Sequence, residues 1–249
     1  SWMHSFPAWA TSFIGREKEI VNIVKVIRRR RIVTITGTGG CGKTRLAREV
    51  ATQLHEDFPD GIWFVDLAPV ESADLVERQL MNALGLSENP GVEMIHTIEE
   101  SLQEKKVLLL LDNCEHLLKT CAEMVSRLVD SLPGISVVST SREALHAGGE
   151  QTWIVPSLTL ADPAIENYVE LAESSKAVQL FADRARLNNP GFELVEKNAS
   201  AVSTICHRLD GIPLAIELVA SRTRYLDTIT ILDRLSDSFG KIQSPDPGI

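Results

Sequence analysis

Residues 37–44 read Gly-Thr-Gly-Gly-Cys-Gly-Lys-Thr and follow directly on an apolar stretch, Ile32-Val33-Thr34-Ile35-Thr36. Glycines tolerate positive φ and carry no Cβ, so a loop of this composition folds closely around a phosphate chain. Its successive N–H groups form an anion nest at the N-terminus of the helix that begins near Lys43. A strand, this loop and an amphipathic helix, in that order, predict a binding site for a nucleoside triphosphate or diphosphate.

The same loop supplies two side chains with separate tasks. Lys43 places a mobile positive charge near the β- and γ-phosphates, and the Thr44 hydroxyl is placed to ligate Mg²⁺. The predicted cofactor-binding residues in this part of the chain are Gly37, Thr38, Gly39, Gly40, Cys41, Gly42, Lys43, Thr44 and Arg45. Nucleotide and Mg²⁺ are therefore the expected cofactors.

Length and charge limit the other functions of the chain. Its 249 residues suffice for one large domain or two smaller ones with a well-buried core. Residues 1–31 carry seven Lys/Arg and two Glu (+5), whereas residues 32–249 carry 18 basic and 32 acidic side chains (−14). This acidic body argues against direct, sequence-independent binding of nucleic acid, which needs a basic face.

One basic run, Arg28–Arg31, closes a predicted helix over residues 17–30. It is either a contact for phosphate or DNA, or a solvated end at which cations complement the helix dipole, and we favour the second interpretation. The four cysteines form no CxxC pair and no zinc-finger spacing. We therefore interpret them as free thiols of a cytoplasmic protein. No secretory signal and no apolar run of roughly 20 residues is found, so we expect no membrane partner.

Strand and helix patterns alternate through the first part of the chain, which predicts a mainly parallel sheet with helices on both faces. The expected fold class is α/β, a P-loop NTPase with five strands, followed by a small all-α domain. Besides residues 32–36, the predicted strands are 61–67, 107–111, 135–140 and 152–155, and the predicted helices after the loop are 72–84, 94–104 and 116–131.

Beyond residue 156 only helical patterns remain. Amphipathic spacing predicts helices over residues 174–187, 197–209 and 213–225, with a further one over 228–239. The expected organisation is a nucleotide-binding domain (11–156), a linker (156–173), a helical domain (174–240) and two tails (1–10 and 241–249).

Four consecutive leucines, Leu108–Leu111, end in Asp112, so a buried strand delivers a carboxylate to its carboxyl end. Opposite a phosphate loop this is the carboxylate that Mg²⁺ requires. The next residue is Asn113, whose amide orients a water but cannot take its proton, so we expect slow hydrolysis. Glu115 is close enough in sequence to act as the base, or it caps the following helix.

The predicted strand over 135–140 is followed by Ser141-Arg142. If this strand neighbours the Asp112 strand, Arg142 reaches the γ-phosphate and reports whether it is present. The alternative is a solvated arginine at a strand end. The predicted catalytic set is therefore Lys43, Asp112, Arg142 and Glu115, with Thr44 and Asp112 as metal ligands.

The order of five motifs is specific to one class of ATPase. The motifs are Phe13–Glu17, the loop 37–44, Leu111–His116, Ser139–Arg142 and Leu209–Leu214. Over roughly residues 11–240 the chain resembles the STAND class (signal-transduction ATPases with numerous domains), which includes the NB-ARC switches. It looks most like the ATPase modules of bacterial transcriptional regulators of the SARP and LuxR type.

The resemblance implies further roles. Gly15 and Arg16 would pack against adenine and ribose, Pro213 in its Gly-x-Pro motif would contact adenine, and the cofactor would be ATP or ADP. The helical domain would be a nucleotide-dependent lid; its alternative is an appended bundle in which Pro213 only starts a helix. Members of the class continue into a winged-helix domain and sensor repeats, so we expect the other domains of a longer parent chain as partners.

Three functions compete on this basis. The leading one is a regulatory switch in which ADP holds a closed state, ATP with Mg²⁺ favours an open, self-associating state, and slow hydrolysis resets it. The second is a small-molecule kinase, which needs an acceptor pocket. The third is an AAA-type motor, which needs a basic channel and an arginine finger.

Overall fold

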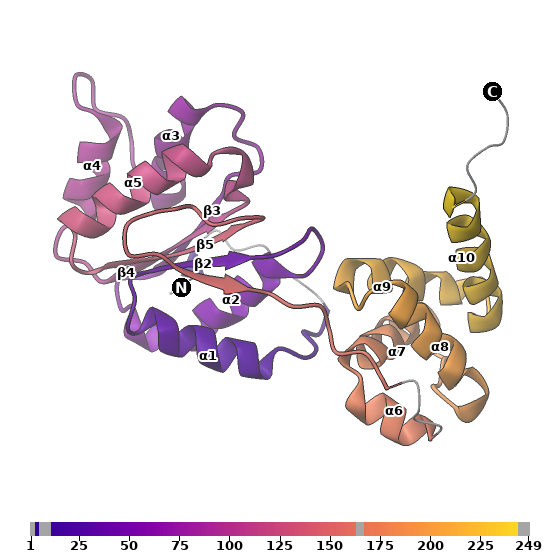
Figure 1. Cartoon of the computed structure of the whole chain (residues 1–249). Helices are drawn as coiled ribbons and strands as arrows, with labels where there is room; N and C mark the ends of the chain where they lie inside the picture. Colours follow the sequence, from indigo (N-terminus) through magenta and orange to yellow (C-terminus); the bar gives the residue numbers. More distant parts are fainter. Residues whose placement is uncertain (1–2, 5–10, 163–166, 244–249) are drawn as a thin grey trace, which may run out of the picture. The chain divides into compact units, whose positions relative to one another are not determined.

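The computed structural model describes residues 3–4, 11–162 and 167–243, and the chain divides into two compact units, Ser1–Val155 and Pro156–Ile249 (Figure 1). The first unit carries a sheet covered by helices, and the second consists of helices. The predicted tail segments 1–2, 5–10 and 244–249 lie outside the described residues.

The sheet of the first unit is parallel throughout, with the strand order β1-β3-β4-β5-β2-β6. The five predicted strands are present, and a two-residue strand in the predicted N-terminal tail adds a sixth at the edge. The strands are β1 (Met3–His4), β2 (Ile32–Thr36), β3 (Ile62–Asp66), β4 (Val107–Asp112), β5 (Ile135–Ser141) and β6 (Gln151–Ile154).

Helices cover both faces of the sheet, with α1 and α2 on one face and α3, α4 and α5 on the other (Figure 1). Alternation along β4 explains this arrangement, because Leu109 and Leu111 join one apolar cluster and Leu108 and Leu110 join the other. The helices are α1 (Glu17–Ile27), α2 (Lys43–Gln53), α3 (Val76–Leu84), α4 (Met94–Leu102) and α5 (Leu118–Ser131).

The position of β5 in the sheet decides which loops meet. In chain order β3 stands between β2 and β4, but in the sheet β5 lies between them. Thr36 pairs with Ser141 and Leu111 pairs with Ser139, so the carboxyl ends of the three strands lie at one edge. The expectation that the Arg142 strand neighbours the Asp112 strand is therefore confirmed.

The second unit begins earlier than the sequence predicts. The sequence predicts a linker over residues 156–173, but α6 occupies residues 168–173 of it. Asn167 caps this helix by accepting a hydrogen bond from the Val169 N–H at 2.9 Å, a short local signal that helical periodicity does not reveal. The helices of this unit are α6 (Tyr168–Ser174), α7 (Lys176–Asn188), α8 (Glu196–Arg208), α9 (Pro213–Ala220) and α10 (Thr228–Gln243).

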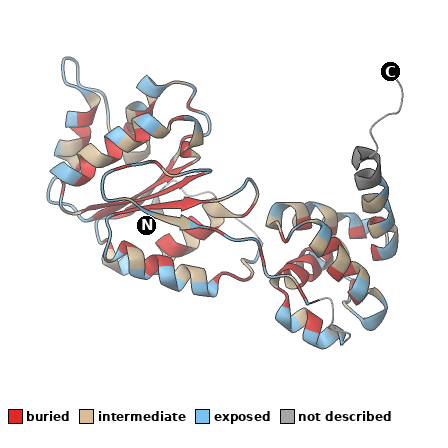
Figure 2. Ribbon diagram, viewed as in Figure 1, coloured by how far each residue is buried: buried red, intermediate tan, exposed pale blue. Residues whose placement is uncertain are grey.

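Residues 158–161 of the expected linker pack into the helical unit, and residues 163–166 of it lie outside the described residues. Leu158 and Ala161 are buried. Figure 2 colours the buried residues of the helical unit red. The Leu158 N–H donates to the carbonyl of Gly211 at 3.0 Å, and His207 Nε2 lies 2.8 Å from the carbonyl of Ala161. None of the helices that the structure describes is both long enough and apolar enough to cross a lipid bilayer.

Candidate functional site

The glycine-rich loop joins β2 to α2, and its backbone requires glycine at several places. Gly40 and Gly42 have φ of 76° and 94°, a region that side chains with a Cβ avoid. A Cβ on Gly37 would lie 2.9 Å from the Cys41 sulfur. Gly42 is the N-cap of α2 and has no side chain to cap it, so the first N–H groups of that helix remain available for an anion.

Lys43 is held within the loop that precedes it. Its Nζ donates to the carbonyl oxygens of Gly37 at 2.9 Å and Thr38 at 3.1 Å. The ammonium group therefore lies beside the backbone of the nest, where a phosphate chain would meet it. These two partners are neutral carbonyls, and a phosphate oxygen offers the stronger, charge-assisted hydrogen bond.

Asp112 ends β4 and is buried against the loop. Its Oδ1 accepts hydrogen bonds from the hydroxyls of Thr44 at 2.7 Å and Thr140 at 2.5 Å. Burial raises the pKa of the Asp112 carboxyl; the two hydroxyl hydrogen bonds oppose the rise, and the negative charges of Asp66 and Glu115 add to it. A cation beside Asp112 would relieve this electrostatic cost.

The arrangement fits a Mg²⁺ ion with few protein ligands. Thr44 donates its hydroxyl proton to Asp112, so its oxygen keeps lone pairs for a cation. The described residues contain no group of three or more His, Cys, Asp or Glu side chains placed to hold a metal. Mg²⁺ usually keeps several waters and takes one or two protein ligands beside substrate phosphates, so Thr44 and Asp112 satisfy its chemistry.

Asn113 takes part in the site in a way that its sequence position does not reveal. It has a left-handed backbone with φ of 63°. Its side-chain amide donates to Asp112 Oδ2 at 3.0 Å and to Asp66 Oδ1 at 3.3 Å, and its backbone N–H donates to Thr140 Oγ1 at 3.1 Å. The amide thus ties the ends of β3 and β4 together.

Sequence reasoning missed Thr140 and Asp66 as parts of this site. Both stand at the carboxyl end of a strand next to β4, and Asp66 pairs directly with Asp112 in the sheet register. The available signal is the polar residue that ends each apolar strand. Using that signal requires knowledge of which strands are neighbours.

Glu115 and Arg142 meet beside the carboxylate. Glu115 lies in the short 3₁₀ helix η3 (Cys114–His116), and its Oε1 is 3.5 Å from Arg142 Nε. The Arg142 side chain is 72% exposed and that of Glu115 is 25% exposed. The other carboxylate oxygen of Glu115, Oε2, is buried and has no hydrogen-bond partner among the described residues.

Two residues expected at the nucleotide form other contacts. Arg45 donates to the carbonyls of Thr11 and Ser12 at 2.8 and 2.9 Å, and its guanidinium lies over the Phe13 ring, 5.5 Å from the ring centre. It therefore anchors the segment that leads into Gly15. The Arg16 side chain is buried, and it forms an ion pair with Glu19 at 3.0 Å.

Pro213 belongs to the helical unit, so it is not among the residues that the sheet unit brings together. It is the first residue of α9, where its missing N–H costs nothing. The preceding Gly211 has φ of 64°, and a Cβ there would lie 2.5 Å from the carbonyl oxygen of Leu158. This glycine is therefore required by packing inside the unit.

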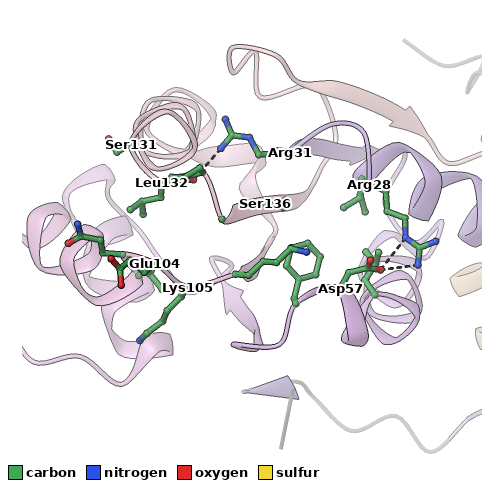
Figure 3. A pocket seen from close by; sticks show the side chains of 16 residues that line it. Arg28, Arg31, Asp57, Glu104, Lys105, Ser131, Leu132 and Ser136 are labelled. Carbon is green, nitrogen blue, oxygen red and sulfur yellow. Dashed lines mark hydrogen bonds and ion pairs between the residues drawn. The ribbon is translucent and has the colours of Figure 1, made fainter.

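A cavity of about 740 Å³ opens at the amino ends of the strands, at the opposite edge of the sheet from the loop (Figure 3). It contains part of the basic run. Arg28 pairs with Asp57 at 2.9 Å, and Arg31 donates to the carbonyls of Val129 at 2.6 Å and Leu132 at 3.1 Å, near the end of α5. Arg31 thus binds carbonyls at the end of α5, as cations do at the negative end of a helix dipole, whereas Arg28 forms an ion pair with a carboxylate.

Strand, glycine-rich loop, helix and buried carboxylate have the arrangement of the P-loop NTPase fold. Residues 27–145 match the family model described as an AAA domain. The fold expected from the sequence is confirmed by solved structures. A STAND protein with a tetratricopeptide-repeat sensor from Pyrococcus horikoshii has a TM-score of 0.56 at 17% identity, over 94% of this chain and 33% of that protein. A Walker-type ATPase of Pyrococcus abyssi has a TM-score of 0.58 at 13% identity, over 92% of this chain and 73% of that one.

Relatives by sequence extend the resemblance to regulators. An uncharacterized protein of Mycobacterium tuberculosis is 41% identical over 239 residues, 96% of this chain and 58% of the relative. A predicted HTH-type transcriptional regulator of the same organism is 42% identical over 214 residues, 86% of this chain and 23% of the relative. The regulatory protein AfsR of Streptomyces griseus is 27% identical over 240 residues, 90% of this chain and 22% of AfsR. The chain thus resembles the ATPase module of such regulators and spans about three fifths or less of these proteins.

Proposed function

We propose that this chain is the ATP/ADP-binding switch module of a bacterial signal-transduction ATPase, and that it controls transcription through other domains of a longer parent chain. The support for the regulatory role is the resemblance to the HTH-type regulator and to AfsR, of which the chain spans 23% and 22%. The support for nucleotide binding is the geometry of the glycine-rich loop and of the Asp112 carboxylate opposite it.

The observation that carries the proposal is the 2.7 Å hydrogen bond from the Thr44 hydroxyl to Asp112. It joins the helix that follows the loop to the end of β4, so two expected metal ligands from distant parts of the chain lie together. Thr44 and Asp112 would hold Mg²⁺, which when bound offsets the charge of the β- and γ-phosphates. Lys43 exchanges its two carbonyl partners for phosphate oxygens.

We infer slow hydrolysis from the residues next to the metal site. The position directly after Asp112 holds Asn113, an amide whose side chain binds Asp112 and Asp66. An amide takes no proton from a water molecule, so general-base assistance is weak at this position. A slow ATPase suits a switch, because the ATP state then persists long enough to act.

The nucleotide acts through its different affinities for two arrangements of the chain. In the proposed scheme the Gly15-Arg16 turn and Pro213 line the adenine, and the helical unit is a lid. ADP holds the closed state, and ATP with Mg²⁺ favours an open state that associates with further copies. Direct contact with nucleic acid is left to other domains.

The test begins with the protein as purified. It is denatured, released nucleotide is identified by chromatography, and turnover of added ATP is then measured with Mg²⁺. Retained ADP and turnover far below one per second support the switch. An empty site with rapid turnover, or fast phosphoryl transfer to an added metabolite, would instead indicate a motor or a kinase.

A further inference from the structure

Glu115 and Arg142 come from separate strands and meet at the edge where the proposed nucleotide binds. Glu115 follows β4 by three residues, and Arg142 directly follows β5. The two strands are neighbours, and Thr140 of β5 donates to Asp112 of β4, which in turn accepts from Thr44. Two hydrogen bonds therefore connect the phosphate loop, through Asp112, to the end of the strand that Arg142 follows.

The two oxygens of the Glu115 carboxylate have different surroundings. Oε1 faces the Arg142 guanidinium at 3.5 Å, whereas Oε2 is buried without a hydrogen-bond partner among the described residues. A buried polar atom that lacks a partner destabilises the fold, and such atoms are rare in folded proteins. If the side chain moves when Arg142 leaves it, this unsatisfied carboxylate oxygen can accept a hydrogen bond from a water molecule.

The ion pair between Arg142 and Glu115 is weak. Its side chain is 72% exposed, and the distance of 3.5 Å exceeds that of a good charge-assisted hydrogen bond. Exposed ion pairs of this kind contribute little to stability. A terminal phosphate carries more negative charge than a carboxylate and accepts two parallel hydrogen bonds from a guanidinium, so it competes successfully for Arg142.

We propose that Glu115 is the resting partner of Arg142 and that the γ-phosphate of ATP draws Arg142 away from it. The released Glu115 carboxylate then binds the attacking water. The water oxygen bonds to the γ-phosphorus, the bond from that phosphorus to the β–γ bridging oxygen breaks, ADP leaves with the electron pair, and Glu115 takes the proton of the water. ADP has no γ-phosphate and leaves the ion pair intact. This inference rests on the proposed nucleotide site and adds a device that couples sensing of ATP to its hydrolysis.

The decisive variant is Glu115→Gln, which keeps the shape of the side chain but removes its charge. ATP no longer competes with the ion pair, so the Kd for AMP-PNP, a slowly hydrolysed analogue, should fall about two- to fivefold, the equivalent of the free energy of an exposed pair. The Kd for ADP should not change. Turnover of ATP should fall about a hundredfold or more, because a general base contributes that much. Calorimetric titration and a phosphate-release assay measure these quantities.

Two further variants distinguish the loss of the Glu115–Arg142 ion pair from the removal of a negative charge near the site. In an Arg142→Ala background, Glu115→Gln should leave the AMP-PNP affinity unchanged, since the competing partner is already gone. Glu143→Gln is the matched control, because Glu143 is an exposed acid beside Arg142 that forms no ion pair in the part of the chain the structure describes. Glu143→Gln removes the same negative charge, and it should alter neither the ratio of ADP to AMP-PNP affinity nor the turnover of ATP. If Glu115→Gln does not fold, Glu115→Asp weakens the pair by shortening the side chain and should show a smaller gain in AMP-PNP affinity.

The outcomes distinguish this inference from the function on which it rests. A wild-type protein that binds neither AMP-PNP nor ADP overturns both. Normal nucleotide binding with an unchanged ratio of ADP to AMP-PNP affinity in Glu115→Gln overturns the ion-pair exchange and leaves the nucleotide site standing. Unchanged turnover in Glu115→Gln removes Glu115 as the base.

Discussion

The chemistry of the site depends on a few side chains whose partners are seen only in the fold. Asp112 is the central one, because it joins the hydroxyls of Thr44 and Thr140 and receives the amide of Asn113. It is buried near two other acids, so its ionised form is costly without a cation. Function and stability therefore oppose each other at this residue.

At Asp112 we predict that Asp112→Asn raises the melting temperature of the nucleotide-free protein at pH 7. The pKa of this carboxyl is higher in the folded chain than in the unfolded chain, so ionisation at neutral pH disfavours the fold. In the wild type, this loss of stability sets in as pH rises from the unfolded pKa towards the folded one. It should be absent from the variant, as thermal denaturation at pH 4 to 8 will show. A lower melting temperature for the variant at pH 7 would contradict the prediction.

The same variant should lose most of its Mg²⁺-dependent ATP binding. Removal of one of two proposed ligands weakens binding of ATP with Mg²⁺ about tenfold or more, and affects ADP less, because ATP offers an additional phosphate to the metal. Titration of ATP and ADP with and without Mg²⁺ tests this. Equal losses for the two nucleotides would argue against a metal role for Asp112.

Lys43→Ala should reduce nucleotide affinity about a hundredfold or more. The ammonium exchanges two neutral carbonyls for phosphate oxygens, and no other cation of the loop has that position. Lys105→Ala, at the cavity on the opposite edge of the sheet, is a matched removal of one positive charge and should leave nucleotide binding unchanged. Unaltered binding by Lys43→Ala would refute the phosphate-loop assignment.

At the scale of the elements, the order of the strands determines where the candidate site lies. Glycines form the turns between elements that pack closely. Gly211 connects α8 to α9 with φ of 64°, and its missing side chain makes room for the Leu158 carbonyl. This turn belongs to the motif expected to contact adenine. In the structure it also attaches the segment after β6 to the helical unit.

Gly211→Ala should therefore destabilise the helical unit by about 1–3 kcal/mol, because the added Cβ meets backbone and the φ angle is unfavourable. Gly191→Ala is the control in the same unit. Its nearest neighbour is a side-chain atom 3.6 Å away, so its effect should be small. Urea denaturation of the full chain, followed by helical circular dichroism, compares the two. Equal effects would show that the contact with Leu158 is unimportant.

At the scale of the whole molecule, the proposed switch requires that one nucleotide affects both compact units. Saturating Mg-ATP at about one hundred times its Kd should stabilise the bound state by about 2.7 kcal/mol. Hydrogen exchange should show this protection in the glycine-rich loop and at the end of β4. Protection of the first turn of α9 in addition would support a lid, and protection confined to the sheet unit would favour an appended bundle.

Local patterns were sufficient to predict much of this protein. Glycines, a lysine and a threonine at fixed spacing predicted the phosphate loop, and runs of alternating or continuous apolar residues predicted five strands, all of which are present. These features follow from the chemistry of neighbouring residues, so they are readable along the chain. The sequence also predicted Asp112 at the end of a buried strand, where the structure places it.

Only the tertiary structure decided how these parts meet. Insertion of β5 between β2 and β4 brings Thr140 to Asp112 and Arg142 to Glu115, and pairing of β3 with β4 brings Asp66 to Asn113. Strand order in a parallel sheet is set by packing between segments distant in sequence, so the hydrophobic periodicity of each segment does not predict it. The sequence did not predict the two-residue strand at Met3–His4 or the short helix α6, because segments this short show no hydrophobic periodicity.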